Sequence, residues 1–163
     1  MRLIIIFIMF TSNILAEEII GIPKIIDGDT VHIDNYKIRF EGIDAPEMKQ
    51  QCKKSKLKIS SIIGYIFYEN YYCGKVSKNN LETKINGSKI KCISSSKDRY
   101  KRYLATCFKD EINLNQWMVR NGHAVAYRRY SKKYIFDEDF AKVNKLGLWQ
   151  GKFLSPEKWR KLN

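Results

Sequence analysis

The sequence predicts a small α+β domain with a mostly antiparallel sheet, and two observations carry this prediction. Patterns typical of two strands, a helix, two more strands and two further helices follow one another along the chain. The length of 163 residues gives room for one domain with a substantial hydrophobic core but not for two. We therefore expect a single domain over residues 17–163.

The first two expected strands form a β-hairpin. Ile25–Ile33 alternates in hydrophobicity over part of its length, and Tyr36–Glu41 alternates throughout, with Asp34 and Asn35 between them. Pro46 disfavours a helical conformation at the residue before it. An ordered turn is therefore expected directly after the second strand.

The middle of the chain predicts a helix and a second hairpin. Lys75–Ile85 is a helix candidate because Asn86 and Gly87 form a strong stop signal. Lys89–Ile93 and Leu104–Phe108 are typical of short strands joined by a polar segment. The Lys- and Tyr-rich stretch before the helix has no period that indicates an element.

Two short helices are expected towards the C-terminus. The first is capped by Asn113 and ends at Asn121-Gly122, and its inward residues are Leu114, Trp117 and Met118. The second is capped by Ser131 and ends at Gly147, and its inward residues are Phe136, Phe140 and Val143.

The chain is strongly basic. It has 30 Lys and Arg against 17 Asp and Glu, a formal net charge of +13 and a pI near 9.6. This excess favours polyanionic partners, namely nucleic acid, an anionic membrane or an acidic polysaccharide. The apolar content of 44% excludes a disordered chain, and the lack of internal repeats excludes a solenoid.

The first sixteen residues have the layout of a secretory signal. One positive charge at Arg2 precedes the apolar run Leu3–Phe10, and the small residue Ala16 stands at the expected cleavage site. A membrane anchor is the alternative, but the run is far shorter than the ~20 residues that span a bilayer. We expect an exported protein, periplasmic or secreted, that is monomeric and has no stable membrane association after cleavage.

Export affects how the four cysteines are interpreted. Cys52, Cys73, Cys92 and Cys107 lack the spacing of a zinc site, and an even number in an exported chain favours two disulfides. In the second hairpin Cys92 and Cys107 would face each other, which leaves Cys52 to pair with Cys73. Four free, buried thiols are the alternative.

Three acidic residues in and just after the first hairpin are candidates for binding a metal ion. Asp29 lies on the first strand, and Asp44 and Glu47 lie just after the second, so the hairpin brings them side by side. Carboxylate oxygens suit a hard cation such as Ca²⁺. Arg39 on the second strand and Arg102 in the later polar segment are suited to grip a phosphate. Taken singly, these residues are more typical of ordinary turns and solvated surface than of a functional site.

Three segments together resemble the thermonuclease family, whose fold is the staphylococcal-nuclease-like fold. They are Ile26–Val31, Ile38–Glu47 and Asp98–Ala105. Shorter matches lie at 114–115, 119–122, 126–127 and 147–149, and the resemblance covers roughly residues 22–160. The cysteines make the chain most similar to an exported bacterial branch, and this supports the pairing inferred above.

The resemblance implies a five-stranded OB-type β-barrel with about three helices, and a Ca²⁺-dependent nuclease that acts on DNA and RNA with little sequence choice. Asp29 and Asp44 match the family's calcium ligands. Glu47 matches the carboxylate that positions or deprotonates the attacking water, and Arg39 and Arg102 match the pair that holds the scissile phosphate. The residues that match its substrate-binding positions are Arg99, Tyr100 and Tyr127.

One departure from the family stands beside a catalytic position. Lys101 replaces the usual glycine before Arg102. If the position needs a positive φ, lysine costs about 1 kcal/mol and Arg102 would be held less precisely.

The alternative function is an inactive OB-fold that only binds single-stranded nucleic acid. A third interpretation, a cationic protein that targets membranes or cell walls, would explain the charge but none of the motifs.

Overall fold

The computed structural model describes residues 16–57 and 67–163. Its strands are β1 (Glu17–Gly21), β2 (Lys24–Ile25), β3 (Thr30–Ile33), β4 (Tyr36–Phe40), β5 (Ile43–Asp44), β6 (Gln51–Leu57), β7 (Phe67–Tyr72), β8 (Ile90–Lys97), β9 (Tyr103–Lys109), β10 (Ile112–Asn113), β11 (Val125–Ala126) and β12 (Gly151–Lys152). Its helices are α2 (Cys73–Ile85), α3 (Leu114–Arg120), α4 (Ile135–Val143), the 3₁₀ helix η1 (Gly147–Gln150) and α5 (Pro156–Leu162). The predicted α+β class is confirmed.

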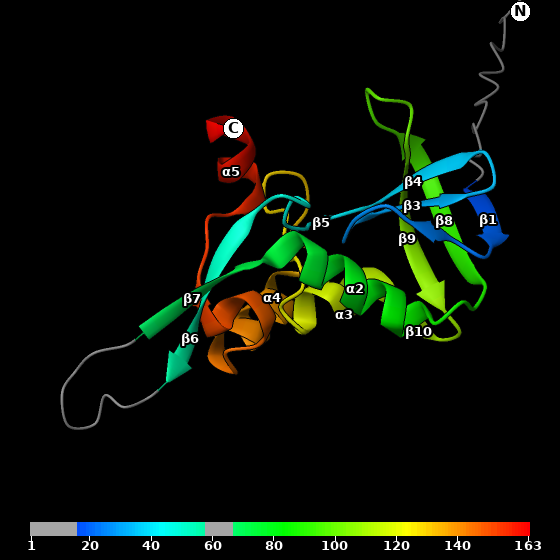
Figure 1. Ribbon diagram of the computed structural model, residues 1–163. Coiled ribbons are helices and arrows are strands. Elements are labelled where there is room, and N and C mark those ends of the chain that lie inside the picture. Colours follow the sequence, from blue (N-terminus) through cyan, green and yellow to red (C-terminus); the bar gives the residue numbers. More distant parts are fainter. Residues whose placement is uncertain (1–15, 58–66) are drawn as a thin grey trace, which may run out of the picture.

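The main sheet has seven strands in the order β1-β8-β9-β4-β3-β2, with β10 beside β9. Among the strand pairs of the described residues only β4 and β9 run parallel, and the sheet curls over a core that α2 and α3 close from one side (Figure 1). The sheet has more strands than the five predicted, but the OB-type architecture agrees with the prediction. Among the helices of the described residues, none is both long and apolar enough to cross a membrane.

Local signals place the turn of the first hairpin, α2 and α3 as predicted. The predicted strand Ile25–Ile33 is wrong in extent, because the run divides into β2 and β3, which pair with each other, and Asp29 lies in the turn between them and not on a strand. Asp34 turns β3 into β4 with φ 48°, in the left-handed region that a tight hairpin needs. α2 ends where Asn86 adopts the left-handed conformation, and its N–H bonds to the carbonyl of Glu82. At the start of α3, the side chain of Asn113 accepts a hydrogen bond from the N–H of Gln116 at 3.0 Å.

The prediction for α4 is wrong at both ends. The helix begins after Tyr134, and the Ser131 hydroxyl instead accepts a bond from the N–H of Lys133 at 3.1 Å. The helix ends at Val143, before the predicted stop at Gly147, which opens the 3₁₀ helix η1.

The buried face of α4 also differs from the prediction. Three residues were predicted to point inward but are exposed: Phe136 by 86%, Phe140 by 39% and Val143 by 81%. Asp137 and Glu138 are buried instead. Asp137 accepts a bond from Arg120 of α3 at 3.2 Å, and Glu138 accepts one from Arg128 at 2.9 Å. These arginines compensate the buried carboxylates, so the acidic side of the helix faces inward.

Several elements were not predicted from the sequence, among them β1, the pair β6 and β7, and α5. β1 pairs with β8 at the edge of the main sheet, and β6 pairs with β7 in a hairpin that projects from the molecule (Figure 1). The hydrophobic residues of β7 fall on both of its faces, so no alternation of hydrophobicity in the sequence marks it as a strand. The helix α5 begins after a Ser155-Pro156 cap.

The two disulfides have the predicted pairing. Cys92 lies directly opposite Cys107 in the β8–β9 register, with 4.0 Å between their Cα atoms. Cys52 of β6 bonds to Cys73, the first residue of α2, with a Cα separation of 5.6 Å. The predicted signal segment is residues 1–16, of which 1–15 lie outside the described residues, and it stays a prediction.

A half-buried histidine should make the fold sensitive to acid. Burial lowers the pKa of His123 from 6.5 to about 4, and its ring lies 5.2 Å from that of Trp117. The unfolded chain therefore binds a proton first, and stability is lost as the pH falls below about 6.5, by up to about 3 kcal/mol at pH 4. His123→Phe should remove this part of the pH dependence in urea unfolding curves. A variant with the wild-type slope between pH 7 and pH 4 would contradict this assignment.

Candidate functional site

Two carboxylates lie side by side where the hairpin β3–β4 meets β5. Asp29 precedes β3 and Asp44 ends β5, and they are only 3% and 1% exposed. Asp29 Oδ2 accepts a bond from the N–H of Ala45 at 2.8 Å, which links the two segments directly. The predicted juxtaposition of these acidic residues is present in the structure.

Arg39 joins the two carboxylates. It stands opposite Thr30 in the β3–β4 register, and its guanidinium donates to Asp29 through Nη1 and to Asp44 Oδ1 through Nη2 at 2.9 Å. Burial lowers the pKa of Arg39, but the charges of Asp29 and Asp44 outweigh burial and raise it above its ordinary value. Arg39 is therefore charged throughout the working pH range.

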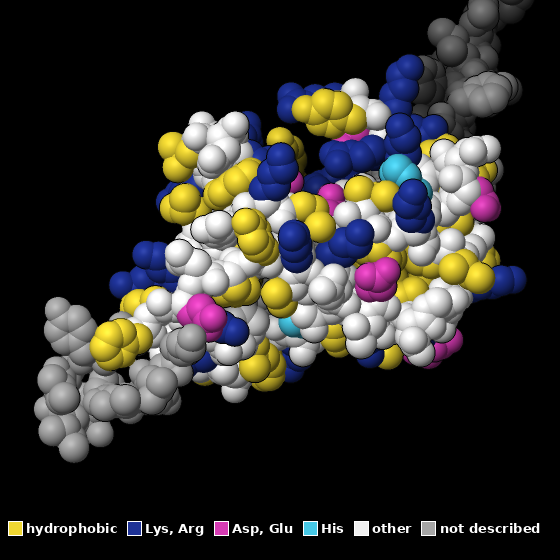
Figure 2. All heavy atoms as spheres, viewed as in Figure 1, with side chains coloured by type: hydrophobic (Ala, Val, Ile, Leu, Met, Phe, Trp, Pro, Cys, Tyr) yellow, Lys and Arg dark blue, Asp and Glu magenta, His cyan; other side chains and the backbone are white. Residues whose placement is uncertain are grey.

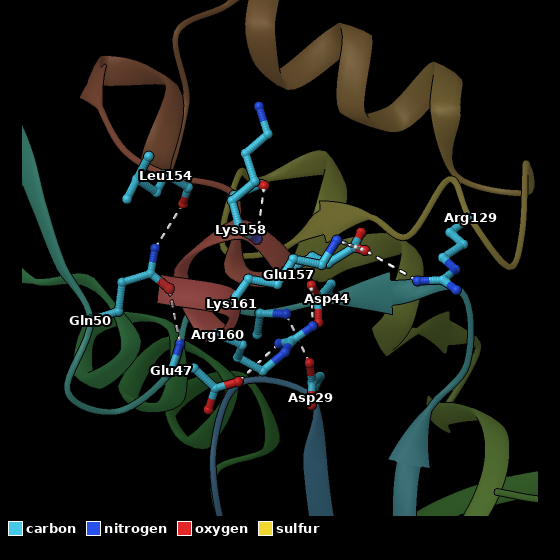
Figure 3. Close-up of polar contacts among 12 residues, drawn as sticks. Asp29, Asp44, Glu47, Gln50, Arg129, Leu154, Glu157, Lys158, Arg160 and Lys161 are labelled. Atoms are coloured by element: carbon cyan, nitrogen blue, oxygen red, sulfur yellow. Dashed lines mark hydrogen bonds and ion pairs between the residues drawn. The ribbon is translucent and has the colours of Figure 1, made fainter. Parts of the chain in front are cut away.

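A residue that sequence reasoning missed completes this cluster. Arg160 of α5 donates from Nη1 to Asp44 Oδ1 at 3.0 Å and to Glu47 Oε1 at 2.9 Å, and from Nη2 to Asp44 Oδ2 at 3.0 Å (Figure 3). The Ser-Pro-Glu sequence at 155–157 is a helix-start signal that could have revealed α5. No local signal marks Arg160 as a partner of carboxylates that precede it by more than a hundred residues.

Burial dominates the titration of the acidic groups. It raises the pKa of Asp44, and hydrogen bonds from Arg160 offset this only in part. It also raises the pKa of Asp27 from 3.8 to about 6, with help from the charge of Asp29. Asp27 Oδ1 accepts a hydrogen bond from the N–H of Asp29 at 2.9 Å. Asp27 is therefore a third acidic residue at the cluster, and it fixes the backbone of Asp29.

The side chain of Gln50 links the backbone of Glu47 to the segment that precedes α5. Its buried side chain accepts a bond from the N–H of Glu47 at 3.2 Å and donates to the carbonyl of Leu154 at 2.8 Å (Figure 3). Glu47 itself lies at the rim, with 36% of its side chain exposed. The turn that carries Glu47 is thereby fixed while its carboxylate stays open to water.

The carboxylates fit a hard cation in their chemistry. Asp29 and Asp44 supply buried, charged oxygens with no His or Cys among them, as Ca²⁺ prefers. Within the described residues, no three His, Cys, Asp or Glu side chains converge as a metal-binding group, because guanidinium groups link Asp44 to Asp29 and Glu47. In this structure Arg39 and Arg160 compensate the negative charges of Asp29 and Asp44.

Arg102 lies apart from this cluster, at the tip of the β8–β9 hairpin. Its Nε donates to Asp98 Oδ2 at 2.8 Å, and the N–H of Arg102 donates to Asp98 Oδ1 at 3.0 Å. Tyr100 is 62% exposed beside it, with the guanidinium carbons of Arg99 and Arg102 4.8 and 5.4 Å from its ring centre. The predicted basic-aromatic group is therefore formed, although no described contact joins it to the carboxylates.

Lys101 adopts the conformation that glycine would accept more easily. Its φ is 61°, yet the loop around Arg102 is intact, with the N–H of Lys101 bonded to the carbonyl of Asp98 at 2.9 Å. Lys101→Gly should therefore raise the free energy of unfolding by up to about 1 kcal/mol. Urea unfolding would measure this, with Lys101→Ala as the control that removes the side chain and keeps the strain. Equal stability of the two variants would show that the backbone carries no such cost.

Tyr127 lines a cleft beside Asp44. The cleft has a volume of about 390 Å³, and its other walls include Arg129 and Lys158. Burial raises the pKa of Tyr127, with a further contribution from the charge of Asp44. On the face shown in Figure 2, Lys and Arg side chains gather around a hollow in which acidic side chains are visible. A second cavity, of about 300 Å³ beside α2 and η1, contains none of the cluster residues.

Comparison with known proteins places this arrangement in a family. The family described as "Staphylococcal nuclease homologue" matches residues 37–151, which include Arg39, Asp44, Glu47 and Arg102. The chain belongs to the staphylococcal nuclease family. The predicted resemblance is thus confirmed, and the two disulfides agree with its cysteine-containing branch.

Relatives of this nuclease-family chain occur in bacteria and plants. It is 33% identical over 138 residues to the succinoglycan biosynthesis protein ExoI of Rhizobium meliloti, covering 83% of the chain and 66% of that protein. It is 28% identical to an uncharacterized endonuclease of Haemophilus influenzae, covering 98% of the chain and 82% of that protein. It is 29% identical to the probable staphylococcal-like nuclease CAN3 of rice, covering 82% of the chain and 30% of that protein.

Proposed function

We propose that this chain is an exported, Ca²⁺-dependent endonuclease that hydrolyses phosphodiester bonds in DNA and RNA with little sequence choice. The observation that carries the proposal is the buried pair Asp29 and Asp44, which Arg39 bridges. Asp44 lines a cleft, and Arg160 joins it to Glu47. Membership of the nuclease family and relatives named endonucleases support the class of reaction. The two disulfides support export.

Asp29 and Asp44 are the residues that would hold Ca²⁺. The bound ion would supply positive charge that attracts a phosphate oxygen and offsets the charge that develops in hydrolysis. The two carboxylates are kept in place for this by Arg39 and by the N–H of Ala45. Their burial excludes water, which strengthens their attraction for any cation that replaces an arginine.

Glu47 would position the attacking water and take its proton. Its carboxylate is partly exposed at the rim, and the turn that carries it is fixed by Gln50. An anchored carboxylate that water can reach meets the geometric need of a general base. Arg39 is more exposed than Asp44, with 15% of its side chain accessible against 1%, and it would hold a phosphate oxygen beside the carboxylates.

Arg102 would reach the phosphate from the β8–β9 tip. In the structure Asp98 holds its guanidinium, so substrate would have to compete with that carboxylate. Arg99 and Tyr100 would contact neighbouring nucleotides through charge and ring stacking, and Tyr127 would line the nucleotide cleft. Nothing in this contact set reads base edges, which agrees with little sequence choice.

A digestion assay tests the proposal. The oxidised protein is incubated with single-stranded DNA, plasmid DNA and RNA, first with Ca²⁺ and then with excess chelator. We expect all three substrates to be cut with Ca²⁺ and none with chelator. Undiminished cutting in chelator would overturn the calcium assignment and with it the roles of Asp29 and Asp44.

One observation favours the alternative, an inactive module that binds single strands. Arg39 and Arg160 already compensate the carboxylates, so the cluster is stable without a metal. Binding of single-stranded DNA with no cleavage under any metal condition would favour this second function.

A further inference from the structure

Arg160 occupies the positions on Asp44 that a metal ion would need. Asp44 Oδ2 bonds to Arg160 Nη2, and Asp44 Oδ1 bonds to both Arg160 Nη1 and Arg39 Nη2, at 2.9–3.0 Å. Arg160 also holds Glu47 Oε1. One guanidinium therefore joins the proposed metal ligand to the proposed base.

A divalent cation would have to compete with the guanidinium for these oxygens, because Asp44 Oδ1 already accepts from Arg39 and Arg160 and Oδ2 accepts from Arg160. Asp44 is 1% exposed, so water screens little of the repulsion that a further cation would meet there. An arginine side chain keeps its positive charge at any working pH. The positive charge can leave the cluster only if the side chain moves.

The helix that carries Arg160 is attached in a way that permits such movement. α5 lies at the C-terminal end, and among its residues only Pro156 is buried. No residue of α5 belongs to the two hydrophobic clusters formed by the described residues. Apart from Arg160, its described ion pair to the body of the protein joins Glu157 to Arg129 at 3.4 Å, and this contact is exposed.

From these contacts we infer that Arg160 is a built-in counter-cation of the carboxylate cluster, which competes with the divalent metal ion. Binding of the ion displaces Arg160 from Asp44 and Glu47 and releases α5. When the ion leaves, Arg160 returns and compensates the buried carboxylates. This inference rests on the proposed calcium dependence.

Calcium titration calorimetry tests the competition. Arg160→Gln removes the competing charge and should bind Ca²⁺ about ten- to a hundredfold more tightly than the wild type. Lys161→Gln is the matched control, because it removes one positive charge from the same helix at a residue whose one ion pair within residues 16–57 and 67–163 is with Glu157, at 3.0 Å. We expect its affinity to stay within about twofold of wild type. Circular dichroism checks that both variants fold.

Amide hydrogen exchange provides a second measurement, on the wild-type protein. Ca²⁺ should speed exchange in residues 156–162 if α5 is released, and Arg160→Gln should show fast exchange there without the ion. Equal Ca²⁺ affinities of wild type and Arg160→Gln, or a weaker variant, would overturn the competition and leave the proposed function standing. Absence of Ca²⁺ binding by every variant would overturn both.

Discussion

Replacing Arg39 by alanine should lower kcat on single-stranded DNA by about a hundred- to a thousandfold. Arg39 donates two hydrogen bonds into the cluster from a side chain that is only 15% exposed, so its charge acts where water screens little. Such a donor matters most when negative charge grows on the phosphate, and kcat should therefore fall more than substrate affinity.

The same change should destabilise the fold. Asp29 and Asp44 would lose their shared partner while remaining buried, which typically costs about 3–5 kcal/mol. Arg39→Lys separates the two effects, because it keeps the charge but cannot bridge both carboxylates in the same planar geometry. We expect it to restore most of the stability and little of the turnover. A folded Arg39→Ala protein with wild-type kcat would remove Arg39 from the catalytic set.

Replacing Glu47 by glutamine should lower kcat by about a hundred- to ten-thousandfold while the fold stays intact. Glutamine has the same shape, and its amide oxygen can still accept the bond that Arg160 donates to Glu47 at 2.9 Å. It cannot accept a proton at neutral pH. The loss should therefore appear in the chemical step and not in nucleotide affinity.

Single-turnover cleavage and equilibrium binding of a short single-stranded DNA, both with saturating Ca²⁺, measure the two quantities separately. Glu82→Gln makes the same chemical change on the exposed face of α2, outside the cluster and the cleft, and should leave both unchanged. If Glu47→Gln instead weakened binding and kept the rate of cleavage, Glu47 would be a substrate contact and not the base.

Much of the site was predictable because its residues lie within one hairpin and the turn that follows it. Two alternating runs around Asp34 and Asn35 predict which strands pair, and that pairing carries Asp29 next to Asp44. The family resemblance added roles for Arg39, Glu47 and the β8–β9 tip. Arg160 could not be found this way, because its partners come from a distant part of the chain and its own surroundings show only a helix start.

The sequence by itself determined the local features: the turns, the caps of α2 and α3, the cysteine pairing across β8 and β9, and the basic charge. These depend on interactions within a few residues or on one strand pair. Only the tertiary structure decided which face of α4 is buried and which cation compensates Asp44. A buried carboxylate is stable only beside a positive partner, and Arg128 and Arg160 reach Glu138 and Asp44 only once distant segments have packed together.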